Sequence, residues 1–255
     1  MNYTTSQIGK QRRFMQSLVD THKEEKKLQI QQVVSIPAYL EETYWWAYVR
    51  PYAIAFFDHE WIVNLILLGN MVKLRDTALD ALGSTIHGHT LQIASVYGEF
   101  SPRLAERIAE GGALDIIDVV PAQLENLRRK LPNLAPVRLI QSDSMSLKAS
   151  DEVYDQAVMF FLLHEMPAPV RERTLSEALR VLKPGGKLVI VDFHKPSPLN
   201  PFRYLYPPMF RLLEPFALDI WNRSIEEWLP KGFVPTEISK QTMFGGLYQK
   251  VVIRK

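Results

Sequence analysis

The sequence predicts an α/β fold: a mostly parallel, doubly wound sheet with an antiparallel last strand. Short apolar segments alternate with amphipathic helical segments from residue 90 to residue 192, which is typical of a parallel sheet with helices on both faces. One of these segments, Asp155–Leu163, is almost wholly apolar, as expected of a strand covered on both faces. Two final strands, Val234–Ser239 and Leu247–Ile253, follow each other closely, which favours antiparallel pairing.

The first strand, Thr90–Ser95, is followed by a tight turn at Gly98 and then by a helix. Ser101 is expected to cap this helix and Pro102 to occupy its first position. Strand, tight turn and helix together predict the start of a βαβ unit.

The second strand, Ala113–Val119, carries Asp118 near its carboxyl end. An acid about twenty residues after the first turn usually accepts hydrogen bonds from ribose hydroxyls, so this spacing predicts a nucleotide-type site. The turn itself departs from that pattern, because Ala94, Val96 and Tyr97 stand where small residues are expected. A plain α/β domain without a ligand is the alternative.

The remaining elements place more polar side chains at the same edge of the sheet. They are a helix at Pro121–Leu131, a strand at Val137–Gln141, a helix at Val170–Leu182, a turn at Lys183–Gly186 and a strand at Lys187–Asp192. The side chains expected at the carboxyl ends of the strands are Tyr97, Gly98, Asp118, Asp143, His164 and Asp192 or His194. Because ligands of doubly wound sheets bind outside these ends, the shared location favours a functional site.

The chain of 255 residues is expected to divide into regions. These are a polar N-terminal arm at 1–32, a helical cap at 33–83, and the α/β domain at 84–255 with a helical insertion at about 196–232. Within the cap we expect a helix after Pro37, a long amphipathic segment over Tyr52–Leu68 and a helix over Val72–Leu82. Aromatic side chains gather in the cap and again in the insertion. Most are expected to be core, and the alternative is a groove for an apolar ring or tail.

The composition limits the kinds of function that the chain can have. The formal net charge of +2 argues neither for nor against nucleic acid, and we name no nucleic-acid partner. The absence of cysteine excludes disulfides, thiolate metal sites and cysteine nucleophiles. The longest clean apolar stretch, Trp61–Leu68, is far shorter than the ~20 residues that cross a bilayer. We therefore expect a soluble protein that lies against a membrane. Its expected location, cytoplasmic and peripheral to the inner membrane, comes from the family resemblance described below.

These landmarks resemble the class I S-adenosylmethionine (SAM) dependent methyltransferases, which have a Rossmann-like fold. The matching features are Asp118, Asp143 after the third strand, Leu163-His164 after the fourth, the Leu182–Gly186 turn and the antiparallel last strands. The resemblance covers residues 83–255. The resemblance implies that Asp118 holds the ribose, that Asp143 stands near the adenine amine and that Phe161 lies beside the cofactor.

A closer resemblance covers nearly everything after residue 33. The segments TYWWAYV, NLILLGN, SVYGEF, VMFFLLHEMP and FGGLYQKVV are similar to the RquA family of rhodoquinone biosynthesis proteins. This implies conversion of ubiquinone to rhodoquinone by replacement of a ring methoxy group with an amino group. SAM would be the amino donor, assisted by a divalent metal, with manganese preferred. The altered turn at Ala94, Val96 and Tyr97 is shared by that family.

The resemblance also implies roles for individual residues. The cofactor-binding candidates are Ala94, Tyr97, Gly98, Asp118, Val119, Asp143, Ser144 and Phe161. Tyr97, His164 and Glu165 are the catalytic candidates, since one of them must remove a proton from the SAM ammonium. Asp143, His164 and Glu165 are the candidate metal ligands, with His194 as a further possibility.

Three alternatives remain open from the sequence. His164 and Glu165 could be an ordinary histidine after a strand and a helix-capping acid. The protein could be a methyltransferase acting on a quinone or phenol. It could also be a non-catalytic scaffold of the same fold in quinone biosynthesis.

Overall fold

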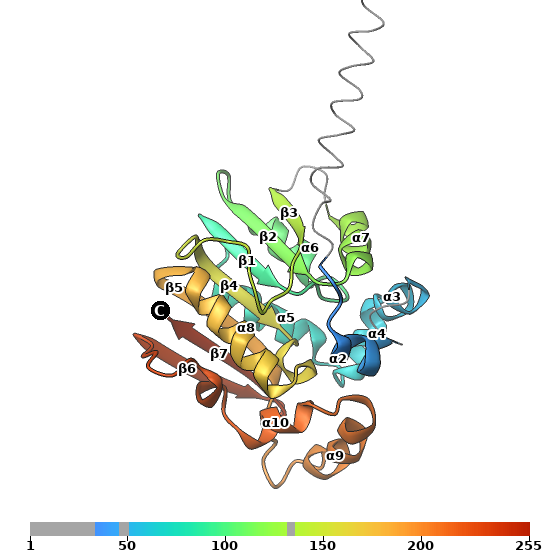
Figure 1. Ribbon diagram of the computed structural model, residues 1–255. Helices are drawn as coiled ribbons and strands as arrows, with labels where there is room; N and C mark the ends of the chain where they lie inside the picture. The colour runs from blue at the N-terminus through green and yellow to red at the C-terminus, as the bar shows by residue number, and fades with distance from the viewer. Residues whose placement is uncertain (1–33, 46–50, 132–135) are drawn as a thin grey trace, which may run out of the picture. The chain divides into compact units, whose positions relative to one another are not determined.

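The computed structural model describes residues 34–45, 51–131 and 136–255 (Figure 1). The expected N-terminal arm and residues 46–50 of the aromatic run lie outside this part of the chain. Residues from Ile36 to Lys255 belong to one compact unit.

In this part of the chain a seven-stranded sheet has the order β3-β2-β1-β4-β5-β7-β6. The strands are β1 His89–Ile93, β2 Ala113–Asp118, β3 Val137–Gln141, β4 Tyr154–Phe160, β5 Leu182–Phe193, β6 Glu237–Met243 and β7 Tyr248–Arg254. Strands β1 to β5 are parallel, and β7 runs antiparallel between β5 and β6. The predicted mostly parallel sheet with an antiparallel last strand is confirmed.

Helices surround this sheet. They are α2 Ala38–Thr43, α3 Pro51–Phe57, α4 Glu60–Ile66, α5 Met71–Leu82, α6 Phe100–Glu106, α7 Pro121–Lys130, α8 Ala168–Val181, α9 Phe202–Leu213 and α10 Ala217–Asn222, with short 3₁₀ turns η2 Leu163–Glu165 and η3 Ile225–Trp228. Figure 1 shows α8 crossing one face of the sheet, with α5 and α6 on the other.

Strand β4 illustrates why the sheet is covered on both faces. Successive side chains of a strand point to opposite faces. Val158 and Phe160 pack with α5 and α6, whereas Ala157 and Met159 pack with α8, and all four are buried. An apolar residue is therefore needed at every position, which accounts for the unbroken apolar run in the sequence.

Three local expectations were wrong for identifiable reasons. The segment 52–68 forms two helices, because the chain bends at Asp58, whose carboxylate binds Lys130 Nζ. Ser101 lies inside α6, and its hydroxyl accepts a hydrogen bond from Gln92 Nε2 (2.8 Å). The expected turn at 183–186 is part of β5, where Gly185 takes a left-handed φ of 77° beside an irregularity in the β4–β5 pairing.

Across the described ranges, no helix is both long enough and apolar enough to span a bilayer.

Candidate functional site

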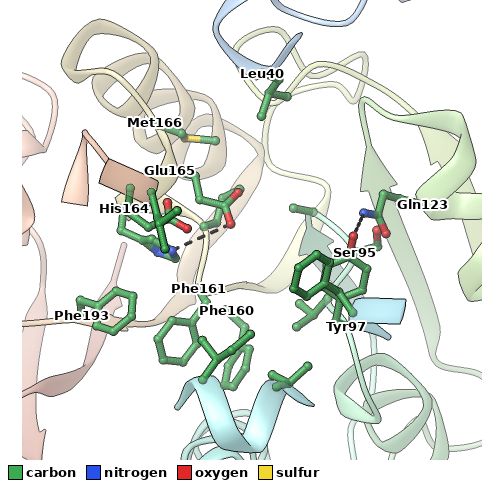
Figure 2. A pocket seen from close by; sticks show the side chains of 18 of the residues that line it. Leu40, Ser95, Tyr97, Gln123, Phe160, Phe161, His164, Glu165, Met166 and Phe193 are labelled. Atoms are coloured by element: carbon green, nitrogen blue, oxygen red, sulfur yellow. Dashed lines mark hydrogen bonds and ion pairs between the residues drawn. The ribbon is translucent and has the colours of Figure 1, made fainter. Parts of the chain in front are cut away.

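A cavity of about 840 Å³ lies outside the carboxyl ends of the parallel strands. This volume is within the roughly 300–1,000 Å³ typical of small-molecule sites. The sheet side contributes Ala94, Ser95, Val96, Tyr97, Asp118, Val119, Asp143, Ser144, Phe161, His164 and Glu165, and the helical side contributes residues that include Tyr39, Leu65, Leu205, Met209, Leu213 and Glu214. Of the cofactor-binding candidates, Gly98 alone is absent from this lining. In Figure 2, His164 and Glu165 lie on one side of the cavity, and Ser95, Tyr97 and Gln123 lie on the other.

The turn after β1 has a backbone that glycine would normally supply. Ala94 has a φ of 68°, a left-handed conformation that costs an L-residue roughly 1–2 kcal/mol. Hydrogen bonds hold the turn in this shape: Gln92 Nε2 donates to Ala94 O (2.9 Å), and Ser95 N donates to Asp118 Oδ2 (2.9 Å). The backbone of a nucleotide-type turn is thus retained without its glycines.

Asp118 joins this turn to the end of β2. Its Oδ2 also accepts the Ser95 hydroxyl (2.6 Å), and its Oδ1 accepts the amide of Val120 (2.8 Å). Burial raises the pKa of Asp118, and its hydrogen bonds to Ser95 and Val120 oppose that rise. A carboxylate fixed in this way and lining the cavity suits a ligand that offers hydroxyl donors.

Tyr97 and Val96 narrow the cavity but leave it open. The Tyr97 hydroxyl accepts a hydrogen bond from Gln123 Nε2 (2.8 Å), and its ring stacks on Phe57 with centroids 6.2 Å apart. Val96 packs against the apolar core. Burial raises the pKa of Tyr97, so its phenol stays neutral near pH 7 and does not fit the role of a base. The side chain instead connects the turn to α3 and α7.

His164 forms a buried pair with Asp192. The ring Nδ1 lies 2.9 Å from Asp192 Oδ1, while Asp192 Oδ2 accepts the amide of Leu163. Burial disfavours a charged imidazole, yet the charge and hydrogen bond of Asp192, with Glu214 and Glu165, together raise the pKa of His164 to about 9. The raised pKa favours the protonated imidazole near pH 7, so the site suits His164 better as a hydrogen-bond donor than as a base. Its Nε2 lies 3.9 Å from Glu165 Oε1.

A buried arginine holds the loop that carries this pair. Arg171 Nε donates to Leu163 O (2.9 Å), and its Nη2 donates to Met166 O (2.8 Å). The guanidinium also lies over the ring of Trp228, 4.4 Å from its centroid. Because donors bind the loop on either side of His164 and Glu165, both side chains are held at the cavity wall.

The expected metal site is not assembled. Asp143, His164 and Glu165 line the same cavity, but within residues 34–45, 51–131 and 136–255 no three His, Cys, Asp or Glu side chains are grouped closely enough to hold a metal ion. His194 lies away from the cavity lining, with its Nδ1 2.7 Å from Gly246 O. The residues present do not fit a manganese site.

Sequence reasoning missed several residues that shape the site. They are Ser95, Gln123, Arg171 and Glu214, together with the pairing of His164 and Asp192. Asp192 was noted as a polar residue at a strand end, but its partner lies 28 residues away and cannot be read from spacing. The remaining residues carry no local signal, because their contacts come from elements far apart in the sequence.

Comparison with known proteins agrees with this architecture. The methyltransferase domain family matches residues 91–186. A demethylmenaquinone methyltransferase of Beutenbergia cavernae is 30% identical over 178 residues, which are 66% of this chain and 70% of that protein. The ubiquinone/menaquinone biosynthesis C-methyltransferase UbiE of Haemophilus ducreyi is 30% identical over 131 residues, which are 50% of this chain and 49% of that protein. The chain spans 49% to 66% of the length of three such relatives.

Solved structures share the fold. A SAM-dependent methyltransferase from Aquifex aeolicus has a TM-score of 0.54 at 20% identity, covering 80% of this chain and 98% of that one. The N-methyltransferase NodS from Bradyrhizobium japonicum in complex with S-adenosylhomocysteine has a TM-score of 0.53 at 15% identity, covering 72% and 86%. The chain therefore belongs to the class I SAM-dependent methyltransferase family that includes the demethylmenaquinone methyltransferases. This membership supports SAM as the ligand of the cavity.

Proposed function

We propose that this protein converts ubiquinone to rhodoquinone, with SAM as the amino donor. The observation that carries the proposal is the turn after β1, which keeps a nucleotide-type backbone at Ala94 while Tyr97 and Val96 occupy the space beside it. In an ordinary methyltransferase this turn grips the amino-acid end of SAM. Crowding here favours a cofactor whose amino end points elsewhere in the cavity. The sequence resemblance to the RquA family in the cap, the turn and the final strands supports the same reaction.

The sheet side of the cavity suits the nucleoside. In the proposed complex the Asp118 carboxylate accepts the ribose hydroxyls, while Asp143 and Ser144 lie beside the adenine. Phe161, which has a φ of 53°, holds its ring at the cavity wall near His164. Asp143 is itself fixed, because its Oδ1 accepts the amide of Met145 (2.8 Å).

When bound, SAM would supply its α-nitrogen to the ring carbon in place of the methoxy group. The ammonium would first give up one proton, and the methoxy group would leave as methanol with a second proton of the nitrogen. The bond from the nitrogen to the cofactor carbon would break afterwards, with one proton lost from the neighbouring cofactor carbon and one gained by the nitrogen. The protonated His164 donates a hydrogen bond to a quinone oxygen, which stabilises the negative charge that develops there. Glu165, beside His164, is the candidate base that removes the proton from the SAM ammonium. No step needs a metal ligand from this chain.

The helical side suits an isoprenoid tail. Leu65, Leu205 and Leu213 line the cavity and remain 68%, 64% and 42% exposed. Apolar side chains exposed at the mouth of a cavity match an apolar ligand that arrives from a bilayer, each buried CH₂ contributing about 0.8 kcal/mol. In this proposal α4 and α9 rest on the cytoplasmic surface of the inner membrane.

Methyl transfer to a quinone-type ring is the second candidate. It is favoured by the relatives, which are named as demethylmenaquinone and ubiquinone/menaquinone methyltransferases. In that case SAM would keep its amino end at the turn and present its methyl group to the ring.

Labelled cofactor separates the two reactions. Purified protein is incubated with ubiquinone vesicles and SAM that is labelled either at the α-nitrogen or at the methyl carbon. Mass spectrometry of the quinones should find the nitrogen label and no methyl label. Methyl label in the product would establish the second candidate, and neither label would favour the scaffold.

The altered turn gives a sharper test. The double substitution Val96→Gly with Tyr97→Gly should reduce aminoquinone yield at least about tenfold, because the amino end regains its ordinary place. Full rhodoquinone yield from this variant would contradict the proposed role of the turn, provided that thermal unfolding shows a folded protein.

A further inference from the structure

The helical side of the cavity, called the helical wall below, carries one unusual side chain, Glu214. It caps the C-terminus of α9, where its amide donates to Phe210 O (2.8 Å), and it lines the cavity. Its neighbours on α9 that also line the cavity, Met209, Phe210 and Leu213, are apolar. A carboxyl in such surroundings is retained at a cost unless it is paired.

The chain satisfies this carboxyl incompletely. Glu214 Oε2 is buried and has no hydrogen-bond donor among the residues that the structure describes. By contrast, Asp118 on the opposite wall accepts donors on both oxygens. Buried polar atoms in folded proteins are usually paired, so a donor for Glu214 is expected from a ligand.

The electrostatic surroundings suit a cationic donor. Burial raises the pKa of Glu214, whereas the charge of His164 and a hydrogen bond with the Tyr44 side chain lower it, and the charge of Asp192 raises it further. The charges of His164 and Asp192 largely offset each other as a buried pair. The carboxyl groups of Glu165 and Glu214 therefore line the cavity near a single imidazole, and a cationic ligand group would stabilise the charged form of Glu214.

The chemistry of the proposed ligands identifies the donor. The head group of ubiquinone carries carbonyl and methoxy oxygens, which accept hydrogen bonds but donate none. SAM carries an α-ammonium, and the crowded turn at Val96 and Tyr97 directs that end away from its ordinary place.

We infer that Glu214 is a ligand-binding residue, whose carboxylate receives the α-ammonium of SAM on the quinone side of the cavity. This inference rests on the proposed function and deepens it, because it gives the re-aimed amino end a partner. The insertion at 196–232 would then contribute to cofactor recognition as well as to the tail groove.

Calorimetry with the full chain tests the contact without turnover. The probes are S-adenosylhomocysteine and its desamino analogue, which lacks only the α-amino group. In the wild-type protein the analogue should bind about tenfold more weakly or worse, since hydrogen bonds to charged groups are strong. In Glu214→Gln the ratio of the two affinities, S-adenosylhomocysteine over its desamino analogue, should fall below about threefold. An unchanged ratio in Glu214→Gln would overturn the inference.

Two further variants serve as controls for this test. Glu172→Gln makes the same chemical change at an exposed site on α8 and should keep the wild-type ratio. If Glu214→Gln does not fold, Glu214→Asp keeps the charge and should give an intermediate ratio, whereas a wild-type ratio would contradict the contact. Failure of the proposed function would be seen separately. If the affinity ratio falls in Glu214→Gln but the quinone carries no nitrogen label, the contact with Glu214 is supported and amino transfer is refuted.

Discussion

The two walls of the cavity are built on different principles. On the sheet wall each polar group is fixed by hydrogen bonds: Asp118 accepts three, and Asp192 accepts the amide of Leu163 and pairs with His164. On the helical wall the side chains of α4 and α9 are mainly apolar and partly exposed, and Glu214 Oε2 has no hydrogen-bond donor within the described part of the chain.

This difference teaches how one cavity can receive two unlike ligands. Strand ends offer backbone amides and rigid positions, which suit a polar nucleoside with defined hydroxyls. Short helices offer apolar area with little directional bonding, which suits a ring with a long tail. Perturbing the nucleoside contacts of the sheet wall and the apolar side chains of the helical wall should therefore affect separate ligands.

The largest effect is expected on the sheet wall. Asp118→Asn places an amide among the donors Ser95 and Val120, so it disturbs the turn and removes the charge that the ribose would contact. Affinity for S-adenosylhomocysteine should fall at least about a hundredfold, at roughly 1.5–3 kcal/mol for each charge-assisted hydrogen bond. Calorimetry measures it, and unchanged affinity would refute the assignment of Asp118 to the nucleoside.

The buried pair predicts a pH dependence of stability. The pKa of His164 is about 9 in the folded protein, above its ordinary value of 6.5. Its contribution is therefore fully present below about pH 6.5 and is lost as the pH rises through 9. The free energy of unfolding should fall by roughly 1–3 kcal/mol over that window.

Asp192→Asn sharpens this prediction. Removing the charge that holds the proton should lower the pKa of His164 and flatten the profile between pH 6.5 and 9. Denaturant unfolding at several pH values measures it. A variant that keeps the wild-type slope would show that other groups cause the dependence.

The smallest effect is expected on the helical wall. Met209→Ala removes roughly two methylene equivalents from the cavity lining, about 1.5 kcal/mol. Affinity for a long-chain quinone should fall about tenfold, while affinity for S-adenosylhomocysteine should stay unchanged. Leu199→Ala is the control, because Leu199 is 96% exposed and outside the lining. Equal losses for both ligands would show that the walls are not independent.

Much of the frame could be predicted, because its signals are local. The predicted bounds of β3, Val137–Gln141, agree with the structure, and Asp118 was placed at the end of β2 from spacing alone. Apolar periodicity and turn residues act over a few neighbours, so they can be read along the chain. The helix break at Asp58 could not be read in this way, because Lys130 and Gly98, which bind it, lie far away in sequence.

The sequence by itself determined the order of strands and helices, the edge of the sheet where ligands bind and the unusual turn after the first strand. Tertiary structure alone decided that His164 is charged by Asp192, that Tyr97 joins the turn to the cap without closing the cavity, and that Glu214 reaches the opposite wall. The reason is physical: pKa values and unpaired donors or acceptors depend on burial and on partners that only folding brings together.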